Sequence, residues 1–200
     1  MSQQQFWNEK FARDGYLYGT QANNFIKSCE SNFKKSQRFL CLGEGEGRNA
    51  IYFAKKGFEV VALDASDIGL NKLELLANEN NLKIKTRCID LNEWEPSKKY
   101  GTIIASFLHM HQSDRKALFD KIESCLKDNG FFVGEFFSKK QINYTSGGPK
   151  DLDLLYSVED FTNNFNSCTK HKIVEIETYL DEGKGHQGKA SVIRVIIQKN

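Results

Sequence analysis

An apolar stretch runs directly into a glycine-rich loop in RFLCLGEGEGRN, and a second apolar stretch, EVVALD, ends at Asp64. Glycines at positions 43, 45 and 47 let the backbone turn sharply and approach a ligand closely before a helix begins. Asp64 follows at the end of the next predicted strand, where its carboxylate can accept hydrogen bonds from both hydroxyls of a ribose. This order of strand, loop, helix and strand predicts an α/β fold with a nucleoside-binding edge.

Apolar runs of about four to eight residues alternate with amphipathic stretches over most of the chain, which predicts a largely parallel sheet covered by helices. We expect strands at Arg38–Leu42, Glu59–Asp64, Ile84–Ile89, Gly101–Phe107 and Phe131–Phe137. Polar caps and glycines predict helices at Asn49–Lys56, Ser66–Asn80, Ser113–Lys127 and Ser157–Asn166. The runs Lys172–Leu180 and Ala190–Lys199 have no helix between them, so we expect an antiparallel hairpin.

Size and charge narrow the classes of partner. The 200 residues fit one domain, and a formal net charge of +2 lacks the basic surface that duplex nucleic acid demands. We therefore expect a small-molecule partner and no DNA, with either a monomer or a homodimer. The five cysteines are odd in number and contain no CxxC, which favours reduced thiols. Neither a signal-like N-terminus nor about 18 consecutive apolar residues occur, so we expect a cytoplasmic protein without membrane contact.

The spacing of the glycines separates two classes of nucleotide ligand. Dinucleotide cofactors are bound by GxGxxG, whose third glycine allows the helix to pack beside a pyrophosphate, but here the third glycine comes one residue earlier. Glu44 and Glu46 flank the loop and would repel a pyrophosphate, whereas they tolerate a sulfonium or ammonium group. A nicotinamide-dependent reductase is therefore disfavoured. Asp64 at the next strand end also disfavours a glycine turn that binds nothing.

The segment FLCLGEGEGRNAIYFAKKGFEVVALDAS resembles motif I and its acidic partner in class I S-adenosylmethionine-dependent methyltransferases, and nearly the whole chain resembles their small tellurite-resistance and thiopurine methyltransferase-like group. The resemblance implies a Rossmann-like three-layer sandwich with a seven-stranded, mostly parallel sheet and an antiparallel C-terminal hairpin strand. It implies a single domain, 1–200, with an N-terminal lid over the cofactor (1–30), cofactor-binding βα units (38–137), a substrate-side insertion (138–170) and the hairpin (171–200). Cys41 departs from the pattern, because many class I enzymes carry an acid there.

The same resemblance implies residues that bind S-adenosylmethionine. Asp90 stands where a carboxylate accepts from the adenine amine while Leu91 donates its backbone amide, although an Asp there can also simply form a turn. Arg48 and Asn49 can reach the methionine end of the cofactor or merely cap a helix. The expected cofactor set is Trp7, Tyr18, Gly43, Glu44, Gly45, Gly47, Arg48, Asn49, Asp64, Ala65, Ser66, Asp90, Leu91 and Phe107. Tyr16 and Tyr144 are the expected substrate-binding residues.

Three histidines are candidates for a catalytic base. His109 and His111 follow the fourth predicted strand in SFLHMHQSDR, and His186 lies near the tip of the expected hairpin. A base is needed for an oxygen or nitrogen acceptor that must lose a proton, but not for a thiolate or chalcogen anion. Each histidine can equally be an ordinary exposed or hydrogen-bonded side chain, and HMH without further ligands predicts no metal site. The segment does not resemble the NPPY motif, which disfavours DNA adenine methylation.

The sequence therefore predicts a methyltransferase that uses S-adenosylmethionine and moves a methyl group by in-line displacement to a thiol, a chalcogen or a small metabolite. A regulatory protein that binds S-adenosylmethionine without turnover is one alternative, because fold does not guarantee activity. An RNA or protein methyltransferase is another, with a basic patch at Lys34, Lys35 and Arg38 or at Lys139 and Lys140.

Overall fold

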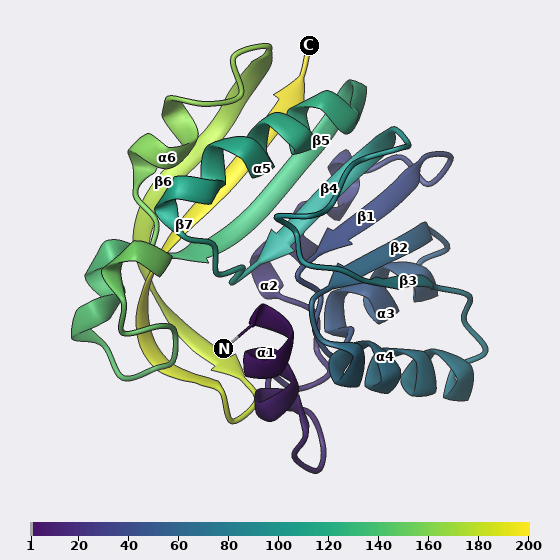
Figure 1. Ribbon diagram of the computed structural model, residues 1–200. Helices are drawn as coiled ribbons and strands as arrows, with labels where there is room; N and C mark the ends of the chain where they lie inside the picture. Colours follow the sequence, from purple (N-terminus) through teal and green to yellow (C-terminus); the bar gives the residue numbers. More distant parts are fainter. Residues whose placement is uncertain (1) are drawn as a thin grey trace.

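Seven strands form one sheet in the computed structural model, which describes residues 2–200 (Figure 1). The strands are β1 (Arg38–Leu42), β2 (Glu59–Asp64), β3 (Lys85–Cys88), β4 (Tyr100–Ser106), β5 (Leu126–Phe137), β6 (Cys168–Glu182) and β7 (His186–Lys199). Their order across the sheet is β3-β2-β1-β4-β5-β7-β6. Strands β1 to β5 pair in parallel, whereas β7 runs antiparallel to both of its neighbours. The predicted mostly parallel sheet with an antiparallel C-terminal hairpin is confirmed.

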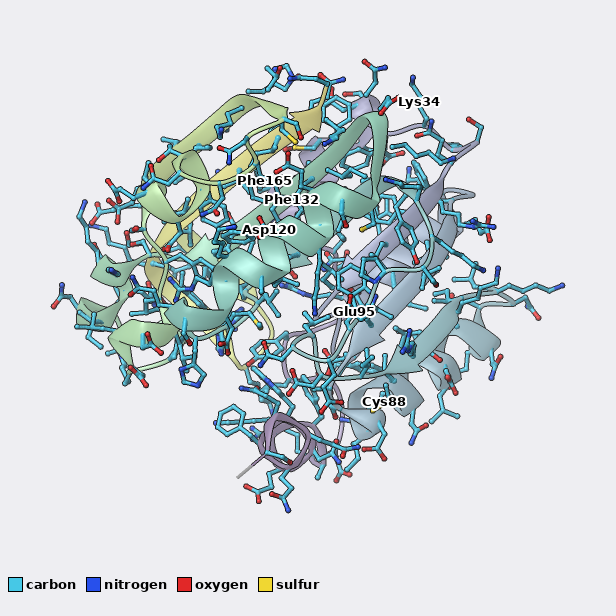
Figure 2. The ribbon with its side chains drawn as sticks, turned by 45° about the horizontal axis from the view of Figure 1, so that its top comes forward. Lys34, Cys88, Glu95, Asp120, Phe132 and Phe165 are labelled. Carbon is cyan, nitrogen blue, oxygen red and sulfur yellow. The ribbon has the colours of Figure 1, made fainter. Side chains whose placement is uncertain are left out.

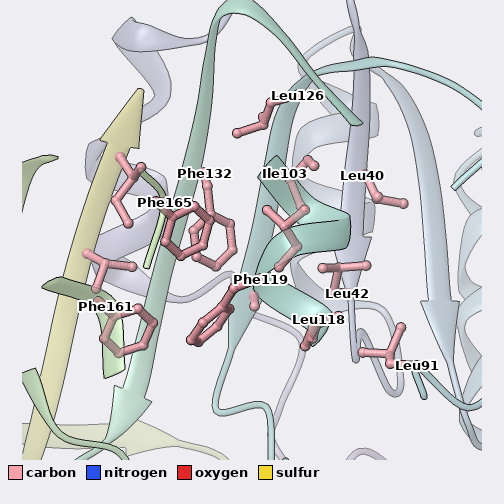
Figure 3. Packing of buried hydrophobic residues seen from close by; sticks show 14 of the residues in the cluster. Leu40, Leu42, Leu91, Ile103, Leu118, Phe119, Leu126, Phe132, Phe161 and Phe165 are labelled. Carbon is pink, nitrogen blue, oxygen red and sulfur yellow. The ribbon is translucent and has the colours of Figure 1, made fainter. Parts of the chain in front are cut away.

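Helices cover both faces of this sheet. They are α1 (Gln3–Phe11), α2 (Asn24–Ser28), α3 (Arg48–Lys55), α4 (Asp67–Glu79), α5 (Gln112–Cys125) and α6 (Val158–Thr162), with short 3₁₀ turns η1 (Glu30–Asn32), η2 (Lys139–Asn143) and η3 (Leu152–Leu154). Leu118 and Phe119 of α5 pack on Ile103 and Phe132 of the sheet, as Figure 3 shows. Helices α2, α3 and α4 bury their apolar residues on the opposite face. The two apolar cores produce the three layers.

Helix α6 is shorter than the sequence predicts. Ser157 and Asp160 form a capping box at its start, as expected from the polar residues there. The helix ends at Thr162 instead of Asn166, and Phe165 adopts a left-handed φ of 58°. Because Phe165 is buried against Phe119 and Phe132, its packing, rather than helix continuation, sets the backbone there.

The C-terminal hairpin is longer than the sequence predicts. Glu182 pairs directly with His186, so the turn comprises residues 183–185 instead of a nine-residue loop. Gly183, with a φ of 63°, provides the left-handed conformation that this tight turn needs. His186 is consequently a strand residue, and its side chain is buried. Within residues 2–200 we find no helix with the length and apolar character needed to cross a bilayer.

Candidate functional site

The glycine loop adopts the conformation for which the sequence selects glycine. Gly43 and Gly45 both have a φ of 60°, a left-handed conformation that other residues rarely adopt, and both line a cavity at the carboxyl ends of β1, β2 and β4. A Cβ at Gly43 would lie 2.7 Å from Cδ1 of Leu108. The loop therefore brings bare backbone to the cavity wall.

Asp64 ends β2 beside this loop. Its Oδ2 accepts the amide of Gly45 and its Oδ1 accepts the amide of Ser66, each at 2.7 Å. Burial raises the pKa of Asp64 to about 6, although the two amide hydrogen bonds act in the opposite direction. Each carboxylate oxygen has a second acceptor site, so Asp64 can still bind hydroxyl groups from the cavity that it lines.

The two glutamates of the loop have different roles. Glu44 lines the cavity, and its Oε1 accepts the amide of Ala50 at 2.7 Å. Burial raises the pKa of Glu44 to about 7. Glu46 is turned away from the cavity, because its carboxylate accepts the amide of Leu17 at 2.7 Å and lies 2.8 Å from Nζ of Lys72. Of the two glutamates that flank the loop, only Glu44 can therefore act on a ligand in the cavity, whereas Glu46 anchors the N-terminal segment.

The cavity has a volume of about 740 Å³, its open mouth included, and brings together most of the residues that the sequence singled out. Of the expected site residues, those that line it are Trp7, Tyr18, Gly43, Glu44, Gly45, Arg48, Asp64, Ala65, Asp90, Leu91, Phe107, His109 and His186. The lining residues that the sequence reasoning did not single out are Gln3, Phe11, Ser106, Leu108 and Met110. Phe11 could have been found from the apolar spacing of the N-terminal helix; the others have no sequence signal that distinguishes them.

Among residues 2–200, three of the expected cofactor-binding residues lie behind the cavity wall and do not line the cavity. Gly47 precedes α3 and packs on Leu73, to which a Cβ would come within 2.4 Å. Ser66 caps α4 through the amide of Gly69. Asn49 accepts the amide of Asn23 at 2.9 Å and donates to Oγ of Ser106 at 3.0 Å. These residues shape the site from behind rather than line it.

Tyr16, His111 and Tyr144 are also placed outside the cavity. Nδ1 of His111 lies 2.5 Å from Oδ2 of Asp153, and its side chain is half exposed. The hydroxyl of Tyr144 donates to Glu177 on the outer face of the hairpin. Tyr16 has the ammonium of Lys72 5.9 Å from its ring centre. Their partners are surface groups of this chain, so their geometry supports no role in binding substrate or moving a proton.

The other two candidate histidines line the cavity, and burial lowers the pKa of both. Nε2 of His109 is buried without a hydrogen-bond partner among residues 2–200, and burial lowers the pKa of His109 to about 3. His186 lies between the rings of Tyr18 and Phe107, at 4.3 and 4.5 Å between ring centres. Burial also lowers the pKa of His186, while Glu182, whose Oε2 lies 3.4 Å from Nδ1 of His186, opposes that shift.

A buried ion pair joins the glycine-loop side to the hairpin. Nη1 of Arg48 lies 2.8 Å from Oε2 of Glu182, and both side chains are less than a tenth exposed. Asn23 donates to both Glu182 and Glu135, at 3.0 and 2.6 Å. Glu135 in turn lies 2.6 Å from Nε of Arg194. No local sequence pattern predicts this network, because its members are far apart along the chain.

The N-terminal segment covers the cavity. Asn8 of α1 donates to Asp67 at 2.8 Å and accepts the hydroxyl of Ser66 at 2.6 Å, which docks the helix on the start of α4. The carbonyl of Leu17 accepts the amide of Gly185 at the hairpin tip, at 2.9 Å. The N-terminal segment and the hairpin tip therefore meet beside the cavity, where the rings of Tyr18 and His186 lie 4.3 Å apart and tilted by 37°.

Comparison with known proteins gives matches to methyltransferases. Residues 39–130 match a methyltransferase domain family. The chain is 26% identical over 123 residues to a ubiquinone biosynthesis O-methyltransferase of Rhodopseudomonas palustris, covering 62% of this chain and 47% of the relative. It is 29% identical over 73 residues to a probable S-adenosyl-L-methionine-dependent methyltransferase, TehB, of Haemophilus influenzae, covering 36% of this chain and 26% of the relative. The chain thus spans about half, or less, of the length of these relatives.

Solved structures share the whole fold. TehB from Haemophilus influenzae superposes with a TM-score of 0.73 at 15% identity, over 100% of this chain and 68% of that one. An S-adenosylmethionine-dependent methyltransferase from Clostridium acetobutylicum superposes with a TM-score of 0.69 at 15% identity, over 98% and 97%. These findings confirm the resemblance to class I methyltransferases, for the segment 39–130 and for the fold.

Proposed function

From the methyltransferase domain that residues 39–130 carry, we propose that this chain transfers a methyl group from S-adenosylmethionine to a small-molecule acceptor: a thiol, a chalcogen or a small metabolite. The observation that carries the proposal is the single cavity that unites the bare backbone of Gly43 and Gly45 with the buried carboxylate of Asp64. When bound, S-adenosylmethionine supplies an electrophilic methyl carbon on a sulfonium sulfur, which keeps the electron pair of the broken bond.

The groups that line the cavity fit this cofactor. Asp64 has free acceptor positions for the two ribose hydroxyls, and Asp90 beside Leu91 offers a carboxylate for the adenine amine. Glu44 brings a third carboxyl group to the same wall, and its pKa of about 7 leaves it only partly ionised near neutral pH. The cation that lines it, Arg48, is paired with Glu182. A wall with this charge favours a ligand with sulfonium and ammonium groups and disfavours a pyrophosphate.

Whether the acceptor must lose a proton decides whether a histidine is needed as a general base. For a hydroxyl acceptor we assign the base to His186, because the carboxylate of Glu182 beside Nδ1 would stabilise the imidazolium. An acceptor that is already a thiolate needs no base. A His186→Gln variant is therefore expected to lower kcat for hydroxyl acceptors at least tenfold and to leave kcat for thiolates nearly unchanged.

Calorimetry with S-adenosylmethionine tests the proposal. We expect saturable binding that weakens about a hundredfold in Asp64→Ala, since two hydrogen bonds to a buried carboxylate are lost. Asp128→Ala, an exposed carboxylate on β5, is the matched control and should bind as the wild type does. Because Asp64 also supports the loop, Asp90→Ala serves as a second variant, with about tenfold weaker binding. A wild-type protein that does not bind S-adenosylmethionine, or that binds NADH more tightly, overturns the proposal.

Turnover separates an enzyme from a silent binding protein. Release of S-adenosylhomocysteine is measured with a panel of thiols, selenite, tellurite and small hydroxylated metabolites, with Asp64→Ala as the negative control. Turnover of any of these supports the proposal, whereas binding without turnover favours the regulatory alternative. One of the two basic patches that would serve an RNA acceptor is badly placed for methyl transfer. Lys34 precedes the amino end of β1, on the opposite side of the sheet's edge from the cavity, which argues against an RNA methyltransferase that uses this patch (Figure 2).

A further inference from the structure

One carboxylate oxygen at the end of β6 faces two basic side chains. Oε2 of Glu182 lies 2.8 Å from Nη1 of Arg48 and 3.4 Å from Nδ1 of His186. All three side chains are less than a tenth exposed. The other oxygen, Oε1, accepts the amide of Asn23 at 3.0 Å. Because a hydrogen bond weakens beyond about 3.2 Å, Glu182 is held closely by Arg48 and only loosely by His186.

The other groups that pack on His186 carry no charge near neutral pH. The two phenylalanine rings that contact it have no titratable group. Burial raises the pKa of Tyr18, on the N-terminal segment, to about 12 and lowers the pKa of His109, after β4, to about 3. Both are therefore neutral from about pH 5 to pH 9. Among the described residues, the charges that act on His186 are those of Glu182 and Arg48.

Arg48 opposes the protonation of His186. Burial lowers the pKa of His186, the carboxylate of Glu182 raises it, and the positive charge of Arg48 lowers it again. A general base is most effective when its pKa is close to the ambient pH, so a lowered pKa makes His186 a weak base. Arg48 weakens it in two ways, because it repels the imidazolium and also neutralises the carboxylate that would stabilise it.

Arg48 is placed to bind an anion from the cavity. Its side chain lines the cofactor cavity, and its ion pair with Glu182 engages one nitrogen, Nη1. A guanidinium has five N–H donors, so it can bind a second anion while it keeps the first. A second anion shares the positive charge of Arg48, which reduces both of its effects on His186. S-adenosylmethionine carries one such anion, the carboxylate of its amino-acid part.

We propose that Arg48 couples cofactor binding to the general base: when Arg48 binds the carboxylate of the cofactor, it releases Glu182 to His186, and His186 becomes an effective base only in that complex. Glu182 is then a positioning residue, which acts through His186. This inference rests on the proposed function, because it needs S-adenosylmethionine in the cavity and a hydroxyl acceptor that must lose a proton.

Proton NMR of the histidine rings tests the coupling without turnover. The chain has four histidines, and the signal that is lost in His186→Gln identifies His186. Its pKa is measured at saturating S-adenosylhomocysteine and at saturating decarboxylated S-adenosylhomocysteine, which keeps the amine and lacks the carboxylate. We expect the pKa of His186 to be higher by about one to two pH units with S-adenosylhomocysteine. An equal pKa with the two ligands, or a lower one with S-adenosylhomocysteine, overturns the inference.

Two variants locate the coupling at Arg48. Arg48→Met removes the cation, so the pKa of His186 should rise without any ligand and should no longer differ between the two ligands. Arg194→Met is the matched control, because it removes a cation of the same network that does not line the cavity, and it should keep the difference. If Arg48→Met does not fold, Arg48→Met/Glu182→Leu takes its place. A difference that survives without Arg48, or that Arg194→Met also abolishes, contradicts the inference.

Binding of S-adenosylhomocysteine, measured first by calorimetry, separates the two hypotheses. If the wild type does not bind it, the proposed function fails and the coupling fails with it. If the wild type binds it but His186 has the same pKa with both ligands, the coupling alone fails.

Discussion

The cavity has a floor, formed by the segment from the glycine loop to Asp64, and a roof, formed where the N-terminal segment meets the C-terminal hairpin. The two are held by different kinds of contact. In the floor, buried carboxylates accept backbone amides that are near in sequence: Glu44 accepts Ala50, six positions on, and Asp64 accepts Gly45, 19 positions back. In the roof, side chains pair over long stretches of chain: Asn23 donates to Glu182, 159 residues away, and Arg48 pairs with the same glutamate. A short segment thus specifies its own floor, whereas the roof forms only once the C-terminal hairpin has closed on it.

The largest effect is expected from breaking the ion pair of the roof. Arg48→Met leaves Glu182 buried without its cation, which should lower the free energy of unfolding by about 3–5 kcal/mol. The double variant Arg48→Met/Glu182→Leu should cost less than either single change, because no buried charge is left unpaired. Urea denaturation measures all three. Lys116→Met, which breaks an exposed pair with Asp120, should cost less than about 1 kcal/mol. Similar losses for Arg48→Met and Lys116→Met would show that the buried ion pair stabilises the roof no more than an exposed pair does.

The floor responds to pH through Glu44. Its folded pKa of about 7 lies above the ordinary 4.5, so the folded state binds more protons between these values. The free energy of unfolding should therefore fall as pH rises from about 4.5 to about 7, by about 3 kcal/mol relative to a Glu44→Gln variant that cannot titrate there. Asp64 titrates in both proteins, so its effect largely cancels. Denaturation curves at several pH values measure the difference, and a constant difference would show that the floor does not hold Glu44 protonated.

The contrast between floor and roof also explains what the sequence could predict. Strands β1 and β2 match the expected residues, since a strand that runs into a glycine loop and a strand that ends in Asp64 are local patterns. The direction of a polar side chain is not local: Glu44 and Glu46 look alike in the sequence, but a distant amide, that of Leu17, turns one of them away from the cavity. The sequence places His186 near the tip of the hairpin because it predicts a nine-residue loop over 181–189, whereas the turn comprises only residues 183–185. A tighter turn at Gly183 would have paired His186 with Glu182.

A smaller effect is expected where the floor meets the helix layer. Gly47→Ala combines a left-handed φ of 95° with a Cβ 2.4 Å from Cγ of Leu73, so it should lower the free energy of unfolding by about 3 kcal/mol. Gly57→Ala has a similar φ of 88° but open space around the new Cβ. It should cost only about 1 kcal/mol. Thermal or urea unfolding measures both, and equal losses would mean that backbone conformation, not packing on α4, requires glycine at position 47.

The smallest effect should come from the docking of α1, which forms the outer part of the roof. Asn8→Ala removes the donation to Asp67 and the acceptor for Ser66, at a helix that lies at the surface. We expect a loss of only about 1 kcal/mol in the free energy of unfolding. Trp7 lines the cavity from the neighbouring position, so affinity for S-adenosylmethionine should fall about threefold to tenfold in calorimetry. Lys10→Ala, on the same helix but directed at Phe6, is the control and should leave that affinity unchanged. If Asn8→Ala binds the cofactor as the wild type does, the roof is held by the hairpin contacts alone, and α1 covers the cavity without contributing to cofactor binding.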